Sequence, residues 1–169
     1  MAKPARNSLP DNIVSAARTF FATTKTSQGR PLLQSERNAT LMIDVLRSYV
    51  AAGKFQLHDF VIMPNHVHLL MSVGGDMTIE KAMQFIKGGF SYRLKERGSV
   101  WQPSFTNHRI RDWEDYERHR EYIRVNPVRA RLAPRPDAYP YSSATAALRM
   151  DAVPQGLKPC GYKEALTRR

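Results

Sequence analysis

The sequence is poor in cysteine and has no long apolar run. Its single cysteine, Cys160, can form neither an internal disulfide nor a cysteine-based zinc cluster, so packing has to stabilise the fold. No apolar stretch approaches the ~20 residues of a membrane-spanning helix. The basic amino terminus is not followed by the apolar core of a secretory signal. We therefore expect a protein of the reducing cytoplasm that has no membrane partner.

Acidic residues are also scarce, with 15 Asp and Glu against 26 Lys and Arg, which gives a formal net charge of +11. An apolar content of 42% in 169 residues is enough for one folded domain with its own core and excludes wholesale disorder. A positive excess favours a polyanionic partner, because each phosphate neutralised by Lys or Arg releases condensed counterions. Charge alone does not identify that partner.

Many of the basic residues lie in one aromatic-containing stretch rather than in a tail. Its members between residues 109 and 135 are Arg109, Arg111, Arg118, Arg120, Arg124, Arg129, Arg131 and Arg135. Arginines on an ordered element favour a shaped groove for nucleic acid. Acidic residues are interleaved among them and can pair at helical spacing, so a solvated helix face is an equal alternative for this segment taken alone.

Hydrophobic periodicity predicts alternating strands and helices. The expected elements are a strand over 18–24, a helix from about 35 that Gly53 closes, a hairpin of 55–63 and 66–73 turned by Pro64-Asn65, a helix over 78–94, an extended stretch over 100–110 and a helix over 112–125. Pro127 is expected to bend or restart the last helix. This order predicts an α+β fold, a ferredoxin-like sandwich with helices on one face of an antiparallel sheet.

The composition also suggests three segments. Residues 1–17 are expected to form a flexible basic arm, residues 18–133 the folded domain, and residues 134–169 a tail rich in proline and alanine that packs on the domain.

The first candidate for chemistry is His66-Val67-His68 at the start of the second hairpin strand. Strand side chains alternate, so both imidazoles project from one face, roughly 6.5 to 7 Å apart at the backbone, and can converge on one divalent ion. The alternative is a pair of ordinary hydrogen-bonded histidines. The tight turn before them and the apolar residues after them favour a polar site at the end of a buried strand.

Tyr122 and Asn126 form a second candidate pair, because residues at i and i+4 share one helix face. An asparagine oxygen suits Mg²⁺ or Mn²⁺ better than zinc, but Asn126 before Pro127 is also a good N-cap for a restarted helix. Tyr122 is either a boundary tyrosine or a nucleophile. Forming a phenolate at pH 7 costs about 4 kcal/mol, so attack on a phosphodiester requires an electrophilic metal. Tyr116 is a rival nucleophile that is not one turn from Asn126.

Two segments carry a family resemblance: His66-Val67-His68 after Met63-Pro64-Asn65, and the stretch Tyr122-Ile123-Arg124-Val125-Asn126-Pro127-Val128-Arg129-Ala130. They resemble the HUH single-tyrosine transposases and, within that class, the REP-associated tyrosine transposases. The narrower likeness rests on residues 85–91, on Trp101-Gln102 with Phe105, on residues 108–111 and on residues 140–144. The matching positions run from about residue 18 to residue 145.

This resemblance implies an HUH-type ferredoxin-like catalytic domain over 18–133 that binds single-stranded DNA hairpins formed by REP palindromes. It implies cleavage by Tyr122 through a 5′-phosphotyrosine, with a free 3′-OH that can rejoin the strand. It also implies that His66, His68 and Asn126 hold a divalent metal, Mg²⁺ or Mn²⁺. The alternative is a non-catalytic, domesticated hairpin-binding protein.

The resemblance further implies a monomer associated with the nucleoid, whereas related insertion-sequence transposases are dimers. The expected contacts to DNA are Lys87, Arg93, Arg109, Arg111, Arg118 and Arg120. Arg131 departs from the family pattern, which often has glycine at this position. That departure is expected to alter a helix end or add a phosphate contact.

Overall fold

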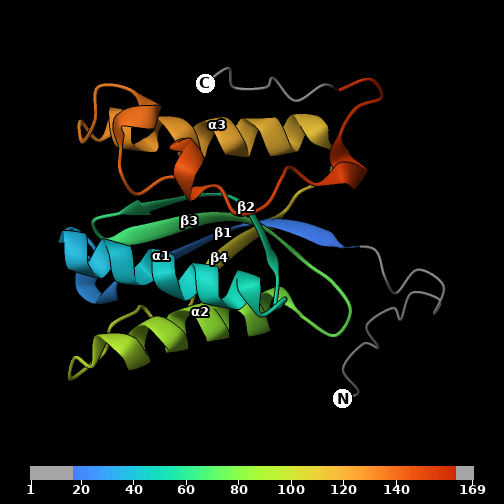
Figure 1. The fold of residues 1–169 in the computed structure, drawn as a ribbon. Helices are drawn as coiled ribbons and strands as arrows, with labels where there is room; N and C mark the ends of the chain where they lie inside the picture. Colours follow the sequence, from blue (N-terminus) through green and yellow to red (C-terminus); the bar gives the residue numbers. More distant parts are fainter. Residues whose placement is uncertain (1–16, 163–169) are drawn as a thin grey trace, which may run out of the picture.

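The sheet has four antiparallel strands in the order β2-β3-β1-β4, and the computed structural model describes residues 17–162 around it (Figure 1). The strands are β1 (Arg18–Lys25), β2 (Gln56–Met63), β3 (His66–Val73) and β4 (Thr106–Arg109). With α1 and α2 in the two crossover connections, this is the ferredoxin-like βαββαβ arrangement. The predicted fold class is therefore confirmed.

Two helices cover one face of the sheet, α1 (Glu36–Ala51) and α2 (Ile79–Leu94) (Figure 1). Each begins at a residue whose hydroxyl accepts a backbone N–H, Ser35 from Asn38 at 3.2 Å and Thr78 from Lys81 at 3.1 Å. Their apolar faces pack on this side of the sheet in one core. That core includes Met42, Leu46, Phe60, Val67, Leu69, Met71, Met83, Ile86 and Phe90.

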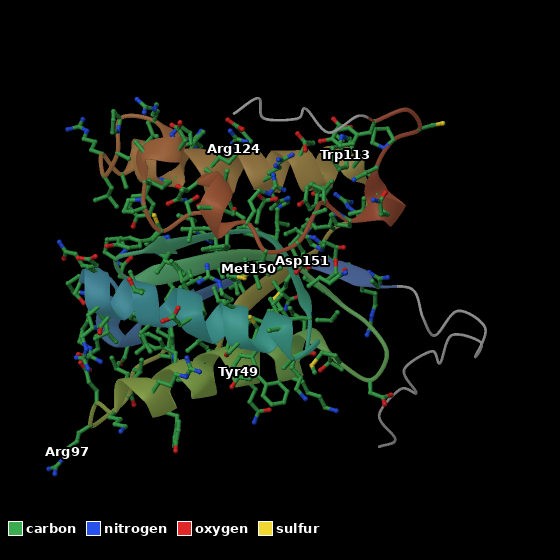
Figure 2. The ribbon with its side chains drawn as sticks, viewed as in Figure 1. Tyr49, Arg97, Trp113, Arg124, Met150 and Asp151 are labelled. Carbon is green, nitrogen blue, oxygen red and sulfur yellow. The ribbon has the colours of Figure 1, made fainter. Side chains whose placement is uncertain are left out.

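The third helix, α3 (Trp113–Arg129), lies on the opposite face, which corrects the expectation that all helices share one face. Figure 2 shows Trp113 and Arg124 on this side of the sheet and Tyr49 of α1 on the other. The reason is that β2 and β3 are buried almost along their whole length on both faces, so the second face also needs a cover. A second core fills it with Val61, Met63, Leu70, Ile110, Tyr116, Ile123, Tyr139 and Val153.

Pro127 lies inside α3, which continues through it to Arg129, so it does not restart the helix as one form of the prediction had it. It occupies the last turn of the helix, where it lacks the N–H that would bond to the carbonyl of Ile123. The helix then ends in a Schellman motif, in which the N–H of Leu132 bonds to the carbonyl of Pro127 at 2.8 Å and that of Arg131 to Val128 at 3.0 Å. Arg131 has the left-handed φ of 58°, the conformation for which this position favours glycine.

The segment after α3 runs along the outer edge of β2. The N–H of Ile62 bonds to the carbonyl of Tyr141 at 2.9 Å, and the N–H of Ser143 bonds to Phe60 at 3.0 Å. Farther along, Asp151 accepts from the N–H of Leu57 at 2.7 Å. These bonds occupy groups that an exposed edge strand would offer to another chain. The short 3-10 turns Pro136–Ala138, Ala146–Leu148 and Gln155–Leu157 shape the segment.

Two of the sequence-based expectations fall partly outside the described residues: the arm, except for Ala17, and the end of the tail beyond residue 162. Within residues 17–162, no helix is both long and apolar enough to cross a bilayer.

Candidate active site

A pocket of about 370 Å³ opens at the end of β1 and the start of β3, on the face that α3 covers. It is lined by Thr23, Lys25, Gly29, Asn65, His66, His68 and Tyr122. The fold therefore brings the predicted histidine pair and the predicted tyrosine into one cavity.

Strand alternation and the tight turn before β3 position the two histidines. His66 and His68 lie opposite Lys25 and Thr23 of β1, so all four side chains project from one face. The two imidazole centroids are 4.7 Å apart. The turn is held because the carbonyl of Asn65 accepts the backbone N–H of Thr26 at 3.0 Å.

His68 has one hydrogen-bonded ring nitrogen and one without a partner. Its Nδ1 lies 2.7 Å from the hydroxyl oxygen of Thr23, whereas its Nε2 is buried and has no hydrogen-bond partner. Burial, together with the nearby His66 and Lys25, lowers the pKa of His68 to about 3, so the ring is neutral at pH 7. A neutral imidazole held at one nitrogen and free at the other is the arrangement of a metal-ligating histidine.

His66 is held in a similar way by its neighbour. Its Nδ1 lies 2.7 Å from Oδ1 of Asn65, and because that oxygen only accepts, Nδ1 is the donor and Nε2 keeps its lone pair. Burial and the charge of Lys25 lower the pKa of His66. Asn65 thus leaves the lone pair of His66 Nε2 available, and at His68 the Thr23 hydroxyl occupies Nδ1, so that Nε2 is the nitrogen without a protein partner.

Tyr122 comes from α3 and lies edge-on against His68, with ring centroids 5.2 Å apart. Phe21 of β1 contacts both rings, at 5.4 Å from His68 and 5.9 Å from Tyr122. Tyr122 keeps 41% of its surface exposed, so a polymeric substrate can reach its hydroxyl group.

Tyr116, the rival nucleophile, has a different environment. It is fully buried, and its hydroxyl donates to Oδ2 of Asp59 at 2.8 Å. Burial and the adjacent Asp59 raise its pKa well above the ordinary value. A buried phenol that is harder to ionise is unsuited to attack, so Tyr116 is a packing residue.

Asn126 lies one turn after Tyr122 on α3 and is half-buried. Because the helix runs through it to Arg129, the alternative interpretation of Asn126 as an N-cap is wrong. It is not among the residues that line the pocket, and its role as third metal ligand stays a prediction.

The donor set fits a divalent metal. The unpartnered Nε2 of His68 is the observation that carries this, because a buried polar atom without a partner is costly unless a ligand or water satisfies it. The second neutral imidazole, His66, is beside it, and the amide oxygen of Asn126 would add an oxygen ligand that suits Mg²⁺ or Mn²⁺.

A second cluster, His108, Asp115 and His119, joins β4 to α3, and its potential ligand atoms lie within 4.8 Å of one another. The carboxylate of Asp115 already accepts from Nε2 of His108 at 2.8 Å and from the N–H of Arg111 at 3.0 Å. The guanidinium groups of Arg111 and Arg118 also lie 3.8 Å from it. Because these groups already compensate its charge, the cluster fits a structural network better than a cation site.

The six predicted DNA-binding residues do not lie on one surface. Arg109 and Arg111 line a larger cleft of about 810 Å³ with Arg18, at the other end of the strands. Arg118 is exposed on α3. Arg120 is mostly buried, 3.7 Å from Asp59 and 3.3 Å from Glu117.

The other two predicted DNA contacts belong to α2, on the far face of the sheet from Tyr122. The ammonium group of Lys87 donates to the carbonyl of Gln102 at 2.8 Å, and burial lowers its pKa. Arg93 lines a hollow between α1 and α2 together with Glu36 and Asp44. The structure therefore does not bring Lys87 and Arg93 to the candidate site.

Sequence reasoning missed four lining residues, Thr23, Lys25, Gly29 and Asn65. Thr23 and Lys25 carry no local motif, and only the register of β1 on β3 places them beside the histidines. Asn65 was interpreted only as a turn residue, although its position next to His66 was a usable signal.

Comparison with known proteins places this geometry in a family. The family model described as "Transposase IS200 like" matches residues 22–126, which include both histidines, Tyr122 and Asn126. The chain is 30% identical over 90 residues to the REP-associated tyrosine transposase of Escherichia coli K12, covering 53% of this chain and 54% of that protein. It is 32% identical over 72 residues to the ISDra2 transposase TnpA of Deinococcus radiodurans, covering 37% of this chain and 51% of that protein.

The match thus spans about half the length of each of these relatives. Among solved structures, that of a REP-associated tyrosine transposase bound to a REP hairpin superposes with a TM-score of 0.62 at 24% identity, covering 100% of this chain and 95% of the other. This likeness supports the fold. The relatives confirm the resemblance read from the motifs, and since the family model covers more than half of the chain, the protein belongs to the IS200-like transposase family.

Proposed function

We propose that the protein is a metal-dependent transposase that cleaves and rejoins single-stranded hairpin DNA of the REP type through a 5′-phosphotyrosine. One observation carries the proposal: Tyr122 stands in an open pocket against His68, whose buried Nε2 has no partner. A purely structural tyrosine and histidine would have no need of this combination.

The chemistry follows from what each side chain can do. His66, His68 and Asn126 would hold Mg²⁺ or Mn²⁺, which polarises the scissile phosphate and stabilises charge on its oxygens. The phenolic oxygen of Tyr122 attacks the phosphorus atom, and the bond to the 3′ oxygen breaks. The enzyme then holds the 5′-phosphate, and the free 3′-OH can attack the phosphotyrosine to rejoin a strand. Thr23 and Asn65 keep the two imidazoles oriented throughout.

Hairpin DNA as the substrate is supported by charge and by the relatives. The chain carries a net charge of +11, and Arg109, Arg111 and Arg118 are basic groups near β4 and α3 that can contact phosphates. The similar solved structure is described as bound to a REP hairpin. Such a substrate implies that the protein acts at the nucleoid, and we propose that it acts as a monomer, since the segment after α3 occupies the β2 edge.

The second candidate function is a non-catalytic hairpin-binding protein. The observation in its favour is that Asn126 is not among the residues lining the pocket. Such a protein would bind hairpins without forming any covalent bond to them.

An adduct assay separates these functions. We expect a labelled single-stranded hairpin carrying host palindromes to form a denaturant-stable protein–DNA adduct in Mg²⁺ or Mn²⁺. Tyr122→Phe should abolish the adduct, and Tyr92→Phe, on a tyrosine 83% exposed on α2, should not. Hairpin binding without an adduct supports the non-catalytic alternative, and cleavage that survives Tyr122→Phe would indicate a hydrolase that uses water.

A further inference from the structure

We propose that Lys25 is an additional catalytic residue whose ammonium group binds the scissile phosphate and stabilises the negative charge that develops when Tyr122 attacks. This inference rests on the proposed function and names a group that the metal-and-tyrosine chemistry does not include.

The position of Lys25 is fixed although its side chain is exposed. It is the last residue of β1 and pairs with His66, so the two side chains project into the same pocket. Its carbonyl accepts the N–H of Gln102 at 2.9 Å, and the next residue, Thr26, bonds to the carbonyl of Asn65 at 3.0 Å. Because these hydrogen bonds hold the backbone at Lys25 and Thr26, the ammonium group of Lys25 moves only by rotation about its own side-chain bonds.

Lys25 sets the charge of the pocket. The lining contains no carboxylate, and in the described part of the chain Lys25 forms no ion pair. An unpaired lysine in a lining without carboxylates makes the cavity attractive to an anion such as a phosphodiester.

The charge balance of the reaction explains why the positive charge of Lys25 favours catalysis rather than binding alone. The bond from the Tyr122 oxygen to phosphorus forms as the bond to the 3′ oxygen breaks. The phenolic proton leaves to solvent, and the 3′ oxygen takes up a proton from solvent. Lys25 keeps its protons. The phosphate carries one negative charge in the ground state and about two at the transition state, so a fixed cation stabilises the transition state more.

The test is a single-turnover adduct assay with protein saturating over labelled hairpin, so that the rate reports the bound complex. We expect Lys25→Met to slow adduct formation roughly 100-fold, the lower end of the loss typical of removing one charge-stabilising contact in an active site. Lys25→Arg should recover most of the rate. The matched control is Lys81→Met on α2, an exposed lysine on the other face of the sheet, which should leave the rate unchanged.

Separate measurements distinguish the possible failures. Hairpin affinity, measured by titration, should change much less than the rate, and thermal unfolding should match that of the wild type. If the wild type forms adduct and Lys25→Met forms it equally fast, or if the loss is entirely one of affinity, the role of Lys25 is overturned and the proposed function stands. If the wild type itself forms no adduct, the proposed function fails and the role of Lys25 falls with it.

Discussion

The hydroxyl oxygen of Thr23 lies 2.7 Å from Nδ1 of His68, and this contact leaves Nε2 of the same ring without a partner. Thr23 therefore occupies Nδ1 and orients the ring so that Nε2 is the nitrogen left for a metal, although Thr23 is not itself a ligand. Groups that fix the tautomer and orientation of a ligating histidine commonly control metal affinity.

The first prediction concerns this contact. Thr23→Val should weaken Mn²⁺ binding about 10- to 100-fold, because the ring loses the partner that orients it. Calorimetric titration of the DNA-free protein with Mn²⁺ measures this. Thr24→Val is the matched control: the Thr24 hydroxyl is buried without a partner, so its replacement should leave the affinity unchanged. Equal affinity in both variants would contradict the assignment.

The second prediction is a pH dependence of stability. The pKa of His68 is about 3 in the folded protein, below its ordinary value of 6.5, so the unfolded state binds more protons between these two values. The stability contributed by neutral His68 is complete above pH 6.5 and falls by up to about 1.4 kcal/mol per pH unit as the pH drops toward 3.

Urea unfolding of the metal-free protein between pH 7 and pH 4 measures this slope. His68→Gln should show a shallower decline than the wild type. The decline should not vanish, because burial also lowers the pKa of His58. Parallel stability curves for the two proteins would rule out the predicted contribution of His68.

The third prediction concerns the end of α3. Arg131 adopts a φ of 58°, a left-handed conformation that is unfavourable for a residue with a Cβ atom. Arg131→Gly should therefore stabilise the protein by about 1 kcal/mol, seen as a higher midpoint in thermal or urea unfolding. Arg129→Gly, inside the last helical turn, should instead destabilise it by about 1 kcal/mol. A loss of stability in Arg131→Gly would count against this account of the helix end.

The fourth prediction separates the two tyrosines of α3. Tyr116→Phe removes the hydroxyl that donates to the buried Asp59 and should lower the free energy of unfolding by about 1 to 3 kcal/mol. It should leave adduct formation intact at a temperature where the variant is folded. Loss of the adduct in folded Tyr116→Phe, with Tyr122 unchanged, would indicate that the wrong tyrosine has been assigned.

Local patterns were enough to predict much of the fold. The apolar stripes placed α1 and α2, and the Pro64-Asn65 turn placed the hairpin, because these signals come from neighbours in sequence. The same holds for the pairing of His66 with His68 on one strand face. The N-termini of α1 and α2, capped by Ser35 and Thr78, likewise follow from local capping chemistry.

The rest depends on long-range pairing. Nothing near Lys25 indicates that β1 will lie antiparallel to β3 with Lys25 opposite His66. The side of the sheet that α3 covers is set by a second core, to which residues as distant as Val61 and Tyr139 contribute. Pro127 was expected to bend or restart the helix, but α3 continues through it and ends two residues later, at Arg129.

Phe21 packs between the candidate active site and the cluster of His108, Asp115 and His119. Its ring contacts His68 and Tyr122 on the pocket side, and it lies 4.8 Å from the ring of His119 on the other. His119 in turn stacks on His108 of β4. His119 and Tyr122 lie one turn apart on α3 and both contact Phe21, so a rigid shift of α3 moves both contacts together and links the position of the nucleophile to the junction between α3 and β4.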